Sequence, residues 1–407
     1  MPDALEAPLA DIRVVEVASY VAVPACGALL ADLGADVIKV EVPGGEVMRH
    51  ATPRRSGYRS ELAQAPHFHM ENRGKRSLEL DLGRADARAA LGRVVDGADV
   101  FLTNLLPRRL ARYELDAATL RAERPRLVFA SLNGYGTEGP DADTPAYDYS
   151  AYWARTGLMD TQRDEGSAPA YLRPGGGDHA AALALATAIL AALRVRDRSG
   201  VGQQVDVNLM HIGFYVAGND ASMVLSTGVN TPRHDRARSR NPLWNHYETR
   251  DGRWLFLVMI DSDRYWPRLA EALGRPEWAR DERFASAVGR YREREDLCAR
   301  IAGRIAEADL DEWEQQLAST DLIWAPVRSL REAIEDPQAQ AARMFADVAH
   351  LAAPGLRTVA PPLHLSSHPM PGDRPAPELG ADGERVLREA GCDDATIAAA
   401  LRNDDAR

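Results

Sequence analysis

Residues 13–40 read RVVEVASYVAVPACGALLADLGADVIKV, and this stretch decides the fold. The β-branched run at 13–17 predicts a buried strand. A short helix is expected at 25–33, because Pro24 is tolerated in a first helical turn and a glycine ends the apolar run. The apolar run at 37–40 predicts a second strand. A strand, a helix and a strand in succession predict one right-handed crossover unit of a parallel sheet.

The same alternation continues through the first 135 residues. Helices are expected at 85–95 and 118–123, and strands at 100–102 and 127–132. This order predicts an α/β domain with a mainly parallel sheet. In such sheets ligands bind beyond the carboxyl ends of the strands. Those ends are occupied here by Glu41, Asn104 and Asn133.

The middle of the chain has a different character. Residues 133–178 are rich in glycine, proline, aspartate, threonine and tyrosine, which predicts irregular structure. A long irregular stretch inside a compact domain is typical of a functional loop. An apolar, alanine-rich helix at 179–194 and a strand at 200–207 are expected next. The apolar run at 180–193 is too short to span a bilayer.

A second folded region begins near residue 240, as a chain of 407 residues allows. The run at 254–260 predicts a buried strand, and helical periodicity extends over 262–319. From about residue 350 the chain becomes proline-rich. It closes with an expected helix near 382–390.

Composition limits the function classes. The apolar fraction is 45%, and 49 basic against 60 acidic residues give a net charge of −11, so we expect a soluble globular protein that does not bind nucleic acid. Three scattered cysteines make no disulfide framework, which favours a reducing cytoplasm. We expect no targeting segment and no membrane partner, because the acidic start lacks an apolar region.

The segment RPGGGDH at 173–179 is the most informative motif. Glycines let the backbone approach a ligand closely. The acid that follows them, Asp178, is expected at a helix N-terminus, where N–H groups stabilise a carboxylate. From these residues alone, Asp178 is either the cap of that helix or a group that faces a ligand.

Basic residues gather in two places. One is the segment NRGKR at 72–76, and the other follows Asn104 as Arg108, Arg109 and Arg112. A ligand with several phosphates needs such charges in an acidic protein, although a solvated basic surface has the same pattern. The candidate phosphate-binding residues are Arg73, Lys75, Arg76 and the one other lysine of the chain, Lys39.

The sequence lacks the motifs of several common chemistries. No Gly-x-Gly-x-x-Gly follows the first strand, so no nicotinamide cofactor is expected. There is no phosphate-binding P-loop, and neither Ser131 nor Cys26 lies in a nucleophile elbow. The pairs His364 with His368 and His67 with His69 are weak signals, so we expect no metal.

Five ordered segments resemble family III CoA-transferases, a group that includes formyl-CoA and carnitine CoA-transferases and related methylacyl-CoA racemases. The first is VVEVASYVAVPACGALLADLGADVIKVEVPGGEVMR at 14–49. The others are ENRGKRSLELDL from Glu71, ADVFLTNLLPRRL from Ala98, RLVFASLNGYGTEGPDADTPAYDY from Arg126 and GGGDHAAALALATAILAALRVRDRSGVGQQVDVNL from Gly175. The C-terminal half matches more loosely, through NPLWNHY, DGRW and IWAPV.

The resemblance implies an α/β fold with two domains. A large Rossmann-like, CoA-binding domain is built from both chain ends, and a smaller α+β domain lies between them. The resemblance also implies that two such subunits interlock as a homodimer. The implied boundaries are 1–210 for the large domain, 211–240 for a linker, 241–325 for the small domain and 326–407 for the return to the large domain.

The resemblance also implies site residues. Asp178 falls on the nucleophile of the family, Tyr147 on an active-site tyrosine and Asp148 on an adjacent acid. The main chain around Gly176 and Gly177 is expected to stabilise an oxyanion. Asn104 and Arg112 fall on positions that contact CoA, and Leu80 on an adenine contact.

The implied reaction moves CoA from an acyl-CoA donor to a carboxylic acid acceptor. It passes through an aspartyl anhydride and an aspartyl-CoA thioester. An ordinary aspartate pKa of ~3.9 would keep Asp178 ionised at pH 7. Coenzyme A enters as part of the co-substrate.

Departures from the family pattern keep other functions open. Val21 stands where formyl-CoA transferases have a glutamine, and their glycine-rich loop is missing near 238–247, so transfer from formyl-CoA to oxalate is not expected. Val21, together with Trp153, Trp244 and His246, indicates an acceptor acid that is more apolar than oxalate. A 2-methylacyl-CoA racemase is the alternative, although tyrosine replaces the base that it needs at Tyr147. An inert CoA-binding protein is a third possibility.

Overall fold

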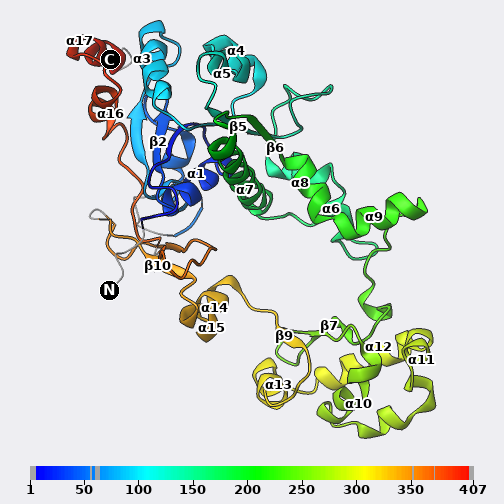
Figure 1. Cartoon of the computed structure of the whole chain (residues 1–407). Coiled ribbons are helices and arrows are strands. Elements are labelled where there is room, and N and C mark those ends of the chain that lie inside the picture. Colours follow the sequence, from blue (N-terminus) through cyan, green and yellow to red (C-terminus); the bar gives the residue numbers. More distant parts are fainter. Residues whose placement is uncertain (1–5, 56, 60–64, 351–352, 371, 403–407) are drawn as a thin grey trace. The chain divides into compact units, whose positions relative to one another are not determined.

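The chain folds into two compact units, and the larger one contains both ends of the described sequence (Figure 1). The structure is a computed structural model that describes residues 6–55, 57–59, 65–350, 353–370 and 372–402. The larger unit comprises 1–159, 171–229 and 338–407, and the smaller unit comprises 160–170 and 230–337.

A six-stranded, fully parallel sheet forms the centre of the larger unit. Its strand order is β3-β2-β1-β4-β5-β6, so the direction of winding reverses between β1 and β4. This is the Rossmann order, which confirms the predicted fold class. The strands are β1 (Arg13–Val17), β2 (Asp36–Glu41), β3 (Arg76–Glu79), β4 (Val100–Thr103), β5 (Val128–Asn133) and β6 (Gln204–Asn208).

Alternate side chains of the central strands enter separate cores on the two faces of the sheet. Val14 packs with α1 (Ala22–Asp32) and α7 (Gly176–Ser199) on one face. Val15 and Val17 pack on the other face with α3, α16 and α17. The bounds of those three helices are Ala85–Asp96, Gly383–Glu389 and Asp394–Ala400. Figure 1 shows the two C-terminal helices beside α3, where they contact it.

Helix α7 is longer than the sequence predicted. It has 24 residues and is long and apolar enough, by length and composition, to cross a membrane. One side of it, including Leu185 and Ile189, lies in the core against α1. The predicted helix began at residue 179 because the glycines before it disfavour helix, whereas the observed helix begins among them.

Shorter elements complete the larger unit and its junction with the smaller one. The segment predicted to be irregular contains a π-helical turn, η2. The shorter elements of the larger unit and the junction are η1 (Val47–His50), α2 (Pro66–Asn72), α4 (Pro107–Tyr113), α5 (Ala117–Glu123), η2 (Tyr149–Ala154), α6 (Leu158–Thr161), α8 (Leu209–Val216), α9 (Gly218–Thr227), α15 (Pro337–Ala341), β10 (Phe345–Asp347) and β11 (Arg357–Val359).

The smaller unit combines an antiparallel three-stranded sheet with helices around a core that contains Trp266 and Trp313. Helices α8 and α9 belong to the larger unit, although the sequence placed most of them in a linker. The elements of the smaller unit are η3 (Arg236–Arg238), β7 (Trp244–Glu248), β8 (Trp254–Val258), α10 (Ser262–Ala272), η4 (Pro276–Arg280), η5 (Glu282–Phe284), α11 (Ala287–Arg292), α12 (Arg294–Ile305), α13 (Leu310–Leu317), β9 (Trp324–Pro326) and α14 (Leu330–Glu335).

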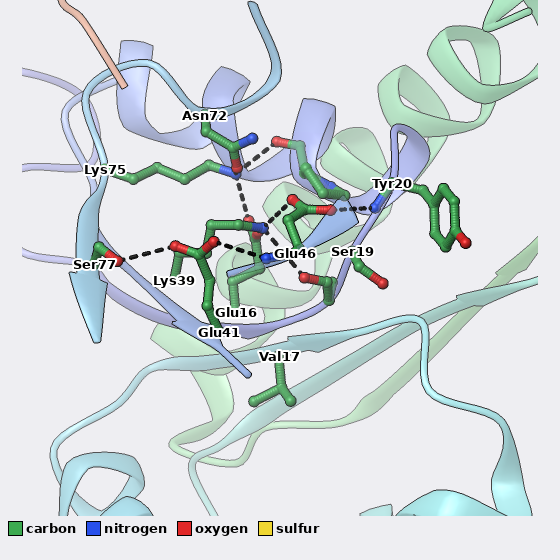
Figure 2. Close-up of polar contacts among 12 residues, drawn as sticks. Glu16, Val17, Ser19, Tyr20, Lys39, Glu41, Glu46, Asn72, Lys75 and Ser77 are labelled. Atoms are coloured by element: carbon green, nitrogen blue, oxygen red, sulfur yellow. Dashed lines mark hydrogen bonds and ion pairs between the residues drawn. The ribbon is translucent and has the colours of Figure 1, made fainter. Parts of the chain in front are cut away.

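Two lysines are buried beside β1 in a network of ion pairs (Figure 2). Glu16 lies opposite Lys39 in the register of β1 and β2, and its Oε1 is 3.1 Å from the Lys39 Nζ. Its other oxygen, Oε2, is 2.7 Å from the Nζ of Lys75. Lys75 also donates to the Asn72 side chain and to the carbonyl of Pro24. Both lysine side chains and Glu16 have zero exposure.

The prediction that these basic residues bind phosphate is therefore wrong for Lys39 and Lys75, since a ligand cannot reach them. Arg73 is also buried, and its guanidinium pairs with Asp32 at 2.6 Å. Arg76 is the first residue of β3 and pairs with Asp36, the first residue of β2. Arg76 thus lies at the amino edge of the sheet, opposite the edge that binds ligands.

Replacing Glu16 with glutamine should destabilise the protein strongly. Two buried ammonium groups would lose the carboxylate that they share, and breaking a buried ion pair costs about 3–5 kcal/mol. Urea denaturation measures this loss. Glu384→Gln removes an exposed pair with Arg388 and should leave the midpoint unchanged. Equal midpoints for the two variants would contradict the importance given to Glu16.

Candidate active site

A cavity of about 230 Å³ opens at the carboxyl ends of β1, β4 and β5. It lies at the point where the strand order reverses, the usual ligand site of open α/β sheets. We call it the Asp178 cavity. Its lining residues are Ser19, Tyr20, Val21, Ala22, Asn104, Leu105, Leu106, Arg109, Leu132, Asn133, Gly134, Pro145, Ala146, Tyr147, Asp178 and Leu209.

A second cavity, of about 320 Å³, adjoins the first on the side of β2 and β3. We call it the Leu80 cavity, because the segment 80–83 forms part of its wall. Four residues line both cavities, so the two hollows share a wall: Ser19, Tyr20, Leu105 and Arg109. A ligand that extends from one cavity into the other would pass these four residues.

Asp178 is the third residue of α7 and lies on the wall of the Asp178 cavity. The N-cap of that helix is Gly175, so the alternative in which Asp178 caps the helix is wrong. Burial raises the pKa of Asp178 to about 7, and the negative charges of Asp148 and Glu71 also raise it, whereas His179 lowers it. The expectation of an ordinary pKa is therefore also wrong, and this carboxyl titrates near neutral pH.

Asp148 fixes the main chain of residues 175–177, which we call the glycine loop. It is buried, and its Oδ2 accepts the backbone N–H groups of Gly175 at 3.1 Å and Gly177 at 3.2 Å. These two donors are consequently unavailable to an oxyanion, which corrects the expectation for that part of the loop. Gly177 also packs too closely for a side chain, because a Cβ there would lie 2.6 Å from the Tyr152 ring.

His179 and Glu71 form a pair that the sequence did not predict. The His179 Nε2 lies 2.8 Å from the Glu71 Oε1, and Glu71 is buried. The hydrogen bond to Glu71 raises the pKa of His179. The available signal was a histidine directly after the candidate nucleophile, but nothing local linked it to a glutamate 108 residues away.

The Tyr147 side chain contacts that of Tyr20. The two hydroxyl oxygens are 3.0 Å apart, and the rings meet edge to face with centroids 5.2 Å apart. Both residues line the Asp178 cavity. Tyr20 was not among the predicted site residues, because a tyrosine after a strand carries no distinguishing pattern.

Two of the predicted CoA-contacting residues line a cavity, and the third lies on the exposed surface. Asn104 lines the Asp178 cavity, and its amide bonds the main chain of Ser19. Leu80 lines the second cavity, although its side chain is almost fully buried. Arg112 is exposed on α4 beside Tyr113, whereas Arg109 on the same helix lines both cavities. Among the described residues, no group of three histidine, cysteine or acidic side chains is placed to hold a metal.

Residues 9–383 match CoA-transferase family III. The chain belongs to this family. It is 29% identical to an (R)-2-hydroxy-4-methylpentanoate CoA-transferase of Clostridioides difficile over 96% of this chain and 97% of that one. It is 30% identical to a cinnamoyl-CoA:phenyllactate CoA-transferase of Clostridium sporogenes, with 93% and 92% covered. A solved CaiB/BaiF family protein of Brucella suis superposes with a TM-score of 0.82 at 30% identity, covering 93% and 98%.

Several features of this family III CoA-transferase match the resemblance found in the sequence. The family match extends over nearly the whole chain, and the relatives named above are CoA-transferases. The protein is therefore an enzyme of this class that acts on an acyl-CoA and a carboxylic acid.

Asp178→Asn should stabilise the enzyme at pH 8. The native state raises the pKa of this acid from 3.8 to about 7, so its stabilising contribution is full at low pH and lost as the pH rises through 7. Removing the charge should restore up to about 4 kcal/mol at pH 8 and almost nothing near pH 4. Thermal unfolding across this range measures the effect.

Asp141→Asn is the matched control, because the pKa of exposed Asp141 is lowered by its hydrogen bond to Arg155. This variant should gain no stability at pH 8. A melting temperature of Asp178→Asn that tracks wild type at every pH would show that Asp178 is not desolvated.

Gly177→Ala should destabilise the glycine loop more than Gly176→Ala does. The new methyl group at 177 would overlap Tyr152 and Asp148, and such overpacking costs about 1–3 kcal/mol. At 176 the nearest contact is the edge of the Trp153 ring at 3.1 Å. Denaturant titration of both variants ranks them, and the reverse order would contradict the close packing at 177.

Proposed function

We propose that this enzyme transfers CoA between carboxylic acids with Asp178 as its nucleophile. The observation that carries the proposal is the position of Asp178, a partly desolvated carboxyl on the wall of a small cavity at the reversal point of the sheet. A carboxylate suits this reaction because its anhydride and thioester conserve the activation of the acyl group. Overall, RCO-SCoA and R′COO⁻ become RCOO⁻ and R′CO-SCoA.

The proposed steps exchange partners on Asp178. Its carboxylate attacks the donor thioester, the C–S bond breaks, and CoA leaves as a thiolate. The thiolate then attacks the aspartyl carbonyl of the mixed anhydride, which releases the donor acid and leaves an aspartyl-CoA thioester. The acceptor carboxylate displaces the thiolate to form a second anhydride, and the thiolate takes the new acyl group and frees Asp178.

The two cavities suit the two parts of an acyl-CoA. We assign the acyl group to the Asp178 cavity and the nucleotide part of CoA to the Leu80 cavity. Arg109 lines both and can pair with a phosphate between them. Asn104 and Arg112 remain proposed CoA contacts, and Asp148 with the glycine loop holds Asp178 in place.

The cavity favours a monocarboxylic acceptor with a mainly apolar chain. Apart from the Asp178 carboxyl, its described lining is apolar, hydroxyl and amide in character, with Arg109 as its single cationic side chain. A second carboxylate would need another cation if it were desolvated there. Val21 contributes an apolar wall, and two relatives are named for hydroxy acids with branched or aromatic chains.

Racemisation of a 2-methylacyl-CoA has less support. It requires a base on each face of the α-carbon. The described lining of the Asp178 cavity contains no histidine, and the Tyr147 hydroxyl is paired with Tyr20. Tyrosine has an ordinary pKa of ~10, which makes it a poor base at neutral pH.

We also propose that the enzyme works in the cytoplasm as an interlocked homodimer. Large apolar side chains are exposed on α8 and α9, with Tyr215 at 81% and Leu225 at 88% exposure, and a second subunit would cover such a surface. The three cysteines are free and buried, which suits a reducing compartment.

Intact mass spectrometry tests the proposed nucleophile. The protein is incubated with a panel of acyl-CoA donors that includes straight, branched, 2-hydroxy, aromatic and dicarboxylic acyl groups. Wild type should gain a covalent adduct of the mass of CoA less one water, and an acceptor acid should discharge it. Asp178→Ala should form no adduct while it still binds free CoA.

A wild-type protein that forms no adduct with any donor would contradict the proposal. If the protein instead exchanges the α-proton of a 2-methylacyl-CoA with solvent deuterium, racemisation replaces CoA transfer as the proposed function. CoA binding with neither reaction would indicate an inert CoA-binding protein.

A further inference from the structure

The main chain that leaves β1 is held by buried charges from the neighbouring strand and loop. The Lys39 ammonium donates to the carbonyl of Ala18 at 3.1 Å. The Glu46 Oε2 accepts the N–H of Tyr20 at 2.7 Å, and its Oε1 lies 2.9 Å from the Lys39 Nζ. Figure 2 shows Glu46 between Lys39 and Tyr20. One ion pair therefore fixes the main chain on both sides of Ser19.

Asn104, which follows β4, fixes Ser19 itself. Its Nδ2 donates to the Ser19 carbonyl at 2.7 Å, and its Oδ1 accepts the Ser19 N–H at 3.3 Å. Four main-chain polar groups in succession are thus bonded to side chains rather than to a helix or strand. Such a segment keeps its conformation when the chain around it would prefer another.

Tyr20 has a conformation that needs this support. Its φ is 69°, in the left-handed region that bulky residues rarely adopt. A glycine would occupy the position without strain. Backbone strain of this kind persists where the surrounding structure enforces it, and it is concentrated at functional sites.

The strained backbone directs the Tyr20 side chain to the wall between the two cavities. Tyr20 lines both, and its hydroxyl meets that of Tyr147 at 3.0 Å. Each hydroxyl carries one proton, so a pair joined by one hydrogen bond keeps one O–H donor for a ligand. This donor lines the same small cavity as the Asp178 carboxyl.

Several donors near Asp178 already have partners, although the Gly176 N–H is not among them. The N–H groups of Gly175 and Gly177 bond Asp148, and the Asn104 amide bonds Ser19. Attack on a thioester places negative charge on its carbonyl oxygen, and a preorganised donor there stabilises the transition state. The hydroxyl pair of Tyr20 and Tyr147 can act as such a preorganised donor, because it is uncharged, held in position by the main chain at Tyr20, and part of the cavity wall.

We propose that Tyr20 is a further catalytic residue, whose hydroxyl, paired with that of Tyr147, donates a hydrogen bond to the carbonyl oxygen of the reacting acyl group. Lys39 and Glu46 are its positioning residues. The inference rests on the proposed function. In this step an oxygen of Asp178 bonds the acyl carbon, the C–S bond breaks and CoA leaves as a thiolate, while the tyrosine keeps its proton.

Tyr20→Phe tests the donor because it keeps the ring and removes the hydroxyl. Removing one oxyanion donor typically costs about a hundredfold or more in kcat, and a neutral, partly exposed pair should lose about tenfold to a hundredfold. The KM for acyl-CoA should change less than about threefold, because the bond strengthens only in the transition state. The Tyr20→Phe/Tyr147→Phe double variant should be little worse than Tyr20→Phe alone, because Tyr147 donates to the Tyr20 hydroxyl and acts through it.

Glu46→Gln tests the positioning role. It should lower kcat in wild type but have little further effect in the Tyr20→Phe background, since the two residues act through one group. Asp32→Asn is the matched control, because it removes a buried carboxylate that pairs with Arg73 and lines neither cavity. It should lower the melting temperature with kcat unchanged.

The results distinguish a failure of the role of Tyr20 from a failure of the proposed CoA transfer. A Tyr20→Phe enzyme with wild-type kcat, beside an inactive Asp178→Ala, would overturn the role of Tyr20 and leave the proposed function standing. A wild-type enzyme that forms no CoA adduct and transfers CoA to no acid would overturn both. If Glu46→Gln fails to fold, Tyr20→Phe alone decides the donor.

Discussion

The carboxylate of Glu16, shared between two buried lysines, is the interaction on which the larger unit depends. It joins β1 to Lys39 on β2 and to Lys75 just before β3. Burial lowers the pKa of Lys75 to about 8, whereas for Lys39 the nearby carboxylates outweigh burial and raise the pKa to about 12. Charges removed from water are tolerated only when each is paired and hydrogen-bonded, so this pairing restricts how the three strands can meet.

The same network connects the sheet to its ligand-binding edge. Lys39 reaches the end of β1 directly, and Glu46 continues the chain of charges to the N–H of Tyr20. Just before Asp178, the buried Asp148 holds the main chain of Gly175 and Gly177 in a comparable way. Buried carboxylates therefore support the main chain both at the end of β1 and at the start of α7. The raised pKa of Asp178 is the stability cost of its position on the cavity wall.

Local periodicity explains why the strands and helices were predictable while several side-chain roles were not. The run at 13–17 and the helix at 85–96 have patterns that depend only on neighbouring residues. Strand β3 was missed, because its four residues include two charged ones and begin with the last residue of the basic cluster at 72–76. Lys75 was assigned to phosphate on charge alone, since its partner Glu16 lies 59 residues away. A list of charges does not distinguish a solvated cation from a buried one.

The sequence by itself determined the alternation of strands and helices apart from β3, the parallel sheet, the family and the candidate acid at residue 178. Each of these follows from short-range pattern or from ordered motifs. Only the tertiary structure decided that Lys39 and Lys75 are buried, that Asp148 bonds the glycine loop, and that Tyr20 meets Tyr147. Those facts depend on which distant residues the sheet brings together and on how much water remains between them, and neither is encoded in local spacing.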